Sequence, residues 1–120
     1  MNGIACVVAA LLASGCSVST DDRPVTADYI AAAILAPGCG RPACHASGAN
    51  AKNYTFDTVA AAKTAMKRLV VAGKPDGSQL LQVMGEATRT KGGIMPPDGP
   101  LPDADIELIR TWITDGAAGL

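Results

Sequence analysis

The sequence has few aromatic residues, one histidine and no excess of charge of either sign. Its 120 residues include one Trp, two Tyr and one Phe, which leaves a domain short of large core-filling side chains. Hydrolytic catalysis has no support, because His45 is the only histidine and no Gly-x-Ser-x-Gly motif occurs. Ten basic and eleven acidic side chains give a net charge of -1, so a nucleic-acid-binding role, which needs a basic excess, is not indicated.

The sequence also lacks the patterns that mark strands and membrane spans. No segment sustains the alternation of apolar and polar residues that is typical of a half-buried strand. The apolar run at the N-terminus is shorter than the roughly 20 residues that cross a bilayer. A hydrophobic content of 48% with 18% charged residues is typical of a folded protein, and the length allows one domain. We therefore expect a single all-α domain.

The N-terminus has the pattern of an export signal. Residues 1–15 carry no charged side chain, residues 4–12 are apolar, and small residues precede Cys16. This resembles the lipobox of bacterial lipoproteins, and it implies a signal peptide over 1–15, a lipid on Cys16 and a tether over 16–25. Ser17 implies sorting to the outer membrane, with the chain lipid-anchored and facing the periplasm. The alternative is an ordinary cleaved signal and a soluble periplasmic or secreted protein.

Export would leave two of the four cysteines in the folded part of the chain. Cys6 would be removed with the signal, and lipid would block Cys16, so that Cys39 and Cys44 remain. Outside the cytoplasm such a pair is either oxidised to a disulfide or consumed by a cofactor.

Residues 39–45 contain Cys39, Cys44 and His45. A cysteine pair that ends in Cys-His is typical of covalent haem attachment, in which the thiols add to the haem vinyl groups and the histidine ligates the iron. Two residues usually separate the cysteines, whereas four do here. The alternative is a disulfide between Cys39 and Cys44, with His45 as an ordinary surface imidazole. A zinc site would need a fourth ligand, and a thioredoxin-type pair would need two intervening residues.

Met95 is the candidate for a second axial ligand. An iron held by one histidine needs a partner on its other side, and a methionine thioether there raises the reduction potential. Met95 lies in a glycine- and proline-rich loop over residues 86–102, where the two prolines that follow it favour an extended backbone. Met66 and Met84 fall within helical apolar patterns and are expected to be core residues.

A first helix is expected over residues 29–35, with Thr26 or Asp28 as its cap and with Pro37 and Gly38 ending it. Its apolar face should consist of Ile30, Ala33 and Ile34.

Two further helices should follow the cysteine motif. One is expected over residues 58–69 with Asp57 as its cap, and the other over residues 79–84 with Ser78 as its cap. The apolar side of the longer helix should consist of Val59, Ala62, Met66 and Leu69. Its basic residues and a nearby lysine, Lys63, Lys67, Arg68 and Lys74, suggest either a solvated helix face or a docking patch for an acidic redox partner.

Residues 104–113 are expected to form the last helix, with Asp103 as its cap and Trp112 as its aromatic anchor. Its buried face should consist of Ile106, Leu108, Ile109, Trp112 and Ile113.

The order of these features resembles that of the small class I cytochromes c, and most closely the exported cytochrome c domains of planctomycetes and myxobacteria. The resemblance covers about residues 27–118 and includes the Cys-(x)n-Cys-His motif, the Met-Pro-Pro loop and the Trp112 helix. It implies a small all-α bundle over residues 26–120, in which the N- and C-terminal helices pack together and Trp112 lies near their crossing.

For the site, the resemblance implies that Cys39 and Cys44 are thioether anchors of one covalent haem c and that His45 and Met95 are the axial ligands of its iron. The chain is then expected to be an electron carrier and not an enzyme, either on its own or as part of a redox enzyme system. It would pass single electrons between redox partner proteins at the cell envelope. The alternative is a haem-free lipoprotein of the same fold, stapled by a Cys39–Cys44 disulfide and acting as a binding or structural module.

Overall fold

Residues 20–49, 51–85 and 94–120 are described by a computed structural model of the chain. The expected signal peptide over 1–15, the lipidation site Cys16 and most of the first half of the expected 86–102 loop lie outside these residues. Over the described ranges the chain folds into helices and contains no strand, which confirms an all-α fold. No helix in these ranges has the length and apolarity needed to cross a membrane.

The N-terminal helical segment is longer than expected. It consists of α1 (Ala27–Tyr29), the π-helical η1 (Ile30–Leu35) and α2 (Ala36–Cys39), which follow one another without a break. Thr26 is the cap, because its Oγ1 accepts a hydrogen bond from the Tyr29 N–H at 3.2 Å.

The expected end of this helix at Pro37 and Gly38 is wrong. Proline normally stops a helix because it lacks an N–H and its ring meets the carbonyl four residues before it. Here the turn before Pro37 is π-helical, with the Ala36 N–H donating to the Ala31 carbonyl five residues back. The wider turn changes which carbonyl faces the proline ring, and the segment continues to Cys39.

The same π-helical turn moves the buried face of the segment. Ala33 is exposed, contrary to expectation, whereas Ala31 and Leu35 are buried together with Ile30 and Ile34. An i to i+5 hydrogen-bonding pattern turns less per residue than an α-helix, so the face drifts away from Ala33.

Helix α3 (Val59–Leu69) begins after Thr58, whose Oγ1 accepts from the Ala61 N–H at 3.1 Å. The expected cap, Asp57, is wrong because the Asp57 carboxylate is bonded to Ser47 instead. Val59 is also not part of the buried side, since it is 37% exposed. The buried residues of α3 are Ala62, Ala65, Met66 and Leu69.

Helix α4 (Gln79–Gln82) is shorter than expected, although Ser78 does stand at its N-cap position. The Ser78 side chain forms no cap hydrogen bond. Its fully buried hydroxyl accepts from the Val71 N–H at 2.9 Å and donates to the Lys74 carbonyl at 2.8 Å. Ser78 therefore closes the preceding turn, and does not cap the helix.

Helix α5 (Asp103–Thr114) begins one residue early, so that Pro102 holds the cap position and Asp103 is the first helical residue. A carboxylate in the first turn still favours the helix, because it faces the positive end of the helix dipole. The buried face contains Leu108, Ile109, Trp112 and Ile113, as expected, while Ile106 is only partly buried. The Trp112 indole donates to the Ala118 carbonyl at 3.0 Å.

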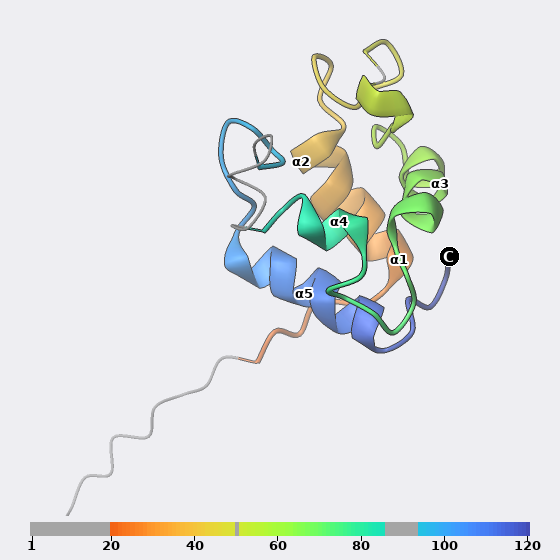
Figure 1. Cartoon of the computed structure of the whole chain (residues 1–120), viewed down its shortest axis with the longest axis vertical. Coiled ribbons are helices and arrows are strands. Elements are labelled where there is room, and N and C mark those ends of the chain that lie inside the picture. The colour runs from red at the N-terminus through yellow and green to blue at the C-terminus, as the bar shows by residue number, and fades with distance from the viewer. Residues whose placement is uncertain (1–19, 50, 86–93) are drawn as a thin grey trace, which may run out of the picture.

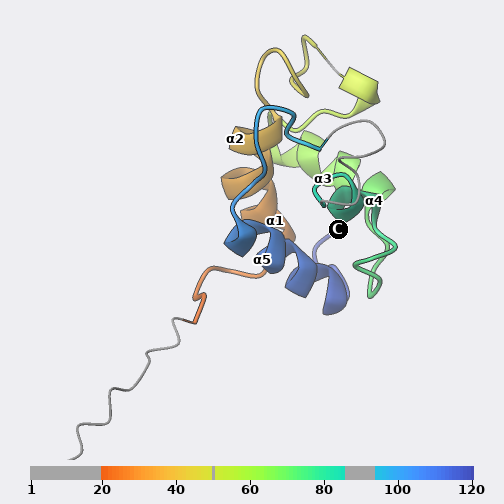
Figure 2. The same cartoon turned by 60° about the vertical axis from the view of Figure 1, so that its left-hand side comes forward.

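One hydrophobic cluster joins the helices. Leu35 of the N-terminal segment, Met66 of α3, Leu80 of α4 and Trp112 of α5 all belong to it and are almost fully buried. Figure 1 and Figure 2 show α5 at one end of the molecule and the loops that follow α2 at the other end. The cysteine motif therefore emerges at the end of the molecule that lies away from α5.

Candidate functional site

The cysteine motif starts where α2 ends. Cys39 is the last residue of α2, and Gly40 lies where the chain passes between that helix and residues 56–57. A Cβ on Gly40 would stand 2.7 Å from the Ala36 carbonyl oxygen and 2.7 Å from the Phe56 carbonyl carbon. Only glycine allows so close an approach of backbone to backbone.

Backbone hydrogen bonds fold the motif into a compact turn. The Cys44 N–H donates to the Arg41 carbonyl at 2.9 Å, and the His45 N–H donates to the Cys39 carbonyl at 3.1 Å. Arg41, together with residues 42–43, is exposed, whereas Cys39, Cys44 and His45 are half-buried. The two cysteines and the histidine thus share one backbone turn, and the residues between the cysteines are its exposed part.

Both cysteines of the motif are free. Burial raises the pKa of the Cys39 thiol to about 11, against the smaller opposing effect of the Arg41 charge and with a small contribution in the same direction from Cys44. Cys39 is accordingly held as the neutral thiol at neutral pH.

The His45 side chain is fixed by residues that follow it closely in the chain. Its Nδ1 lies 3.0 Å from the Tyr54 carbonyl oxygen. A carbonyl oxygen only accepts, so Nδ1 carries the proton and Nε2 keeps its lone pair in the neutral ring. The ring also meets the Phe56 ring edge-to-face at 5.4 Å, and the Phe56 N–H donates to the His45 carbonyl at 2.7 Å. The imidazole is therefore oriented with Nε2 as the nitrogen that keeps a lone pair for a ligand.

The sequence alone does not identify Tyr54 and Phe56 as site residues. Tyr54 acts through its backbone carbonyl, which no side-chain pattern reveals. The available signal is only that two of the four aromatic residues lie within eleven positions of His45.

Ser47 and Asp57 close the loop that begins at the motif. Asp57 Oδ2 accepts from the Ser47 N–H at 2.9 Å and from the Ser47 hydroxyl at 2.6 Å. These hydrogen bonds, first of all the one from the hydroxyl, lower the pKa of the Asp57 carboxyl.

Met95 lies on a second loop that is joined to the first. Its N–H donates to the Val83 carbonyl at 2.8 Å, and its side chain is 36% exposed. Three residues later, Asp98 accepts two hydrogen bonds of 2.8 Å from Arg41, and this ion pair lowers the pKa of the Asp98 carboxyl. In the described part of the chain no hydrogen bond connects Met95 itself to residues 39–45, so the link between the two loops runs through Arg41 and Asp98.

Met66 and Met84 are core residues, as expected. Met66 is fully buried and Met84 is 3% exposed. Among the methionines that the structure describes, Met95 alone is exposed.

The expected basic patch is largely occupied by internal contacts. Lys63 pairs with Asp28 at 2.9 Å, and the Arg68 guanidinium stacks on the Tyr54 ring at 4.6 Å from its centroid. Lys67 and Lys74 are exposed.

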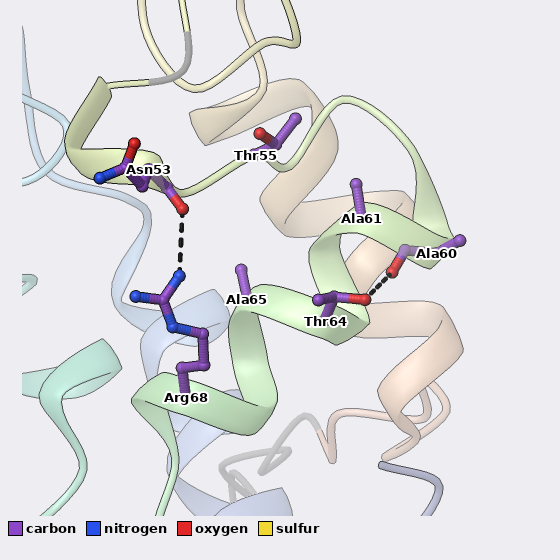
Figure 3. A pocket seen from close by; sticks show the side chains of 7 residues that line it. All are labelled: Asn53, Thr55, Ala60, Ala61, Thr64, Ala65 and Arg68. Atoms are coloured by element: carbon purple, nitrogen blue, oxygen red, sulfur yellow. Dashed lines mark hydrogen bonds between the residues drawn. The ribbon is translucent and has the colours of Figure 1, made fainter.

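A cavity of about 340 Å³ lies between α3 and the segment before it. Its lining residues are Asn53, Thr55, Ala60, Ala61, Thr64, Ala65 and Arg68. Figure 3 shows Ala61 and Ala65 pointing from α3 toward the space, and the Arg68 side chain reaching across to Asn53. None of the candidate haem ligands lines this cavity, so it is separate from the cysteine motif even though Asn53 and Thr55 flank Tyr54.

The end of the expected tether is bound to the domain. Arg23 bonds to the Asp21 carboxylate, to the Asp105 carboxylate and, at 3.0 Å, to the Ala104 carbonyl at the start of α5. Arg23, together with the Asp21 side chain bonded to it, is therefore tied to the start of α5.

None of the protein-family models, curated proteins or solved structures compared with this chain matches it. The assignment of a function therefore depends on the chain's own residues.

Proposed function

We propose that this chain is an exported monohaem c-type cytochrome that carries single electrons between redox partner proteins at the cell envelope. The observation that carries the proposal is the state of His45. Its Nδ1–H is held by the Tyr54 carbonyl, which leaves Nε2 to bind a metal, and two free thiols lie on the same turn. A histidine ligand whose second nitrogen is fixed in this way is the usual arrangement at metal centres in proteins.

The donor set fits a covalent haem. Cys39 and Cys44 would form the two thioethers, and His45 would be the proximal ligand of the iron. The unusual spacing is compatible with this role, because the Cys39–His45 hydrogen bond closes the turn while Arg41 and residues 42–43 stand exposed. The additional residues thus extend away from the side on which the thiols lie half-buried.

Met95 is the proposed distal ligand. It is the one exposed methionine among the described residues, and the Arg41–Asp98 pair joins its loop to the motif. When bound, the haem would supply a one-electron Fe(III)/Fe(II) couple whose potential a thioether ligand raises. The protein residues would orient the ligands and limit access of water, and no substrate would be converted.

We further propose that the helices form a cytochrome c-like bundle with the N- and C-terminal helices packed together. Support comes from the shared hydrophobic cluster, in which Ile34 and Leu35 of the first helical segment and Ile109 and Trp112 of α5 are all buried. The Met-Pro-Pro loop would complete the bundle by covering the haem.

The proposed location is the periplasmic face of the outer membrane, with a lipid on Cys16. The support is the uncharged apolar segment over residues 1–15 and the small residues before Cys16. Export would also bring the chain to the compartment in which a Cys39–Cys44 disulfide is the alternative fate of the two thiols.

Expression of the full chain in a host with haem-maturation machinery tests the cofactor. Intact mass and the absorption spectrum of the reduced protein would be measured. We expect the mass of one haem to remain after acidic acetone extraction, with sharp α and β bands, and we expect the Cys39→Ser, Cys44→Ser double variant to lose both. A wild-type mass lower by two hydrogens, with no haem bands, would instead establish the disulfide-stapled module and refute the cytochrome.

A further inference from the structure

The cavity between α3 and residues 53–55 combines a neutral, partly apolar wall with a single charged group. Ala60, Ala61 and Ala65 supply small apolar side chains, and Arg68 supplies the only ionisable side chain among the lining residues. The cavity opens widely to solvent, and its 340 Å³ leaves room for a small organic molecule.

Arg68 is held in place at this cavity. Its guanidinium lies over the Tyr54 ring at 4.6 Å from the centroid, and its Nη1 donates to the Asn53 carbonyl at 3.2 Å. These contacts use one face of the guanidinium and one of its five N–H donors. The remaining donors are therefore presented in a fixed direction without the usual loss of side-chain freedom on binding.

Arg68 also lacks the counter-ion that other arginines have. Arg23, Arg41 and Arg110 each pair with an aspartate, whereas within the described residues no carboxylate lies within ion-pair distance of Arg68. A preoriented guanidinium that is not neutralised by the protein favours an anion, and a carboxylate matches its paired donors. Arg68 lies in the last turn of α3, at the negative end of the helix dipole, so the positive potential at this end of the cavity comes from the guanidinium and not from the helix.

We infer that this cavity is a binding site for a small carboxylate with a short apolar body, with Arg68 as the anion-binding group and Ala61 and Ala65 in contact with the apolar part. The carboxylate could come from a free organic acid or from a propionate of the proposed haem, since both present the same group. The first source is independent of the proposed function, and the second rests on it.

The site is tested with sodium butyrate as the probe, added to ¹⁵N-labelled full-length protein prepared without haem. Butylammonium chloride at the same ionic strength serves as the control. We expect saturable shifts in the amide resonances of Asn53, Thr55 and Thr64 with butyrate only. Removing the charged partner of a hydrogen bond of this kind usually lowers binding affinity by about ten- to hundredfold.

Arg68→Gln should therefore weaken butyrate binding by at least about tenfold, and Lys67→Gln should leave it unchanged. Lys67 is a matched control because it carries the same charge as Arg68 on the same helix but does not line the cavity. Ala61→Leu, which fills the space at a half-buried position, should also abolish the shifts. Shifts that do not saturate, or equal affinity for Arg68→Gln and wild type in spectra of folded protein, would overturn the inference.

A repeat with the haem-loaded protein distinguishes the two sources of the carboxylate. If butyrate binds equally well with and without haem, the site takes a free acid. If haem loading abolishes butyrate binding, and Arg68→Gln shifts the proton resonances of the haem propionates, a propionate fills the site. Failure of haem attachment would refute the proposed function without affecting the titration of the haem-free chain.

Discussion

Arg41 and Asp98 lie 57 residues apart in sequence and are joined by two parallel hydrogen bonds of 2.8 Å. One belongs to the loop of Cys39, Cys44 and His45, and the other to the loop of Met95. This pair directly connects the two halves of the proposed ligand set.

Breaking the pair should loosen the Met95 loop. Arg41→Gln and Asp98→Asn are each expected to speed hydrogen exchange of the Met95 amide, which is bonded to the Val83 carbonyl. The double variant should exchange no faster than the single ones, because both remove the same contact. Arg110→Gln breaks a comparable surface pair with Asp76 elsewhere and should have no effect. Unchanged Met95 exchange in both single variants would show that the pair does not hold the loop.

Gly40 should not tolerate a side chain. A Cβ there would come within 2.8 Å of three backbone atoms, so Gly40→Ala is expected to destabilise the fold by about 1–3 kcal/mol, as overpacking usually does. Gly48→Ala is the control in the same loop, because a Cβ on Gly48 would meet no atom within 4 Å and the substitution should be nearly neutral. Thermal or denaturant unfolding measures both variants, and equal stabilities would contradict the close approach seen at Gly40.

Met95 and Met66 should respond in opposite ways to truncation. Met66 is fully buried, so Met66→Ala should cost about 2–5 kcal/mol of stability. Met95 is 36% exposed, so Met95→Ala should change stability by less than about 0.5 kcal/mol. In haem-loaded protein, Met95→Ala should nevertheless abolish the near-infrared sulfur-to-iron charge-transfer band. A band that survives this change would exclude Met95 as the distal ligand.

Acid should weaken the loop that Asp57 and Ser47 close. The pKa of Asp57 is lowered in the folded chain from 3.8, so the charged form is favoured by folding. The charged Asp57 carboxylate stabilises the fold at pH values above its pKa in the unfolded chain. This stabilisation is lost as the pH falls through the lower pKa that Asp57 has in the folded chain. Ser47→Ala should raise the Asp57 pKa toward its ordinary value, as followed by ¹³C NMR of the carboxyl carbon. An unchanged Asp57 titration in that variant would show that Ser47 does not cause the shift.

The helices are the part of the fold that the sequence predicts best. The spacing of Ile109, Trp112 and Ile113 predicts a buried face, and the pattern around Met66 predicts another, because both depend on local periodicity. Both predictions are confirmed by the burial of these residues. Caps are less predictable. Asp57 and Asp103 both have side chains that can cap a helix. Asp57 instead accepts a hydrogen bond from Ser47, and Asp103 is already the first residue of α5, so that Pro102 holds the cap position.

The main error in the first helix comes from the turn directly before Pro37. Pro37 and Gly38 are ordinary stop signals, and only the π-helical turn before them allows the segment to reach Cys39. Within the candidate site, Cys39, Cys44 and His45 lie on one turn, as their closeness in sequence requires. The sequence does not reveal the Tyr54 carbonyl that orients His45, because a backbone acceptor has no sequence signature.

Arg23 sets a limit on how far the domain could stand from a membrane. Arg23 is hydrogen-bonded to the start of α5. If Cys16 carries the proposed lipid, only the seven residue steps from Cys16 to Arg23 connect the domain to the membrane. Seven steps of extended chain reach at most about 25 Å. The α5 end would then stay within one domain diameter of the bilayer, with the cysteine motif at the far end. Redox partners would then reach the cysteine motif from the side of the domain that faces away from the bilayer.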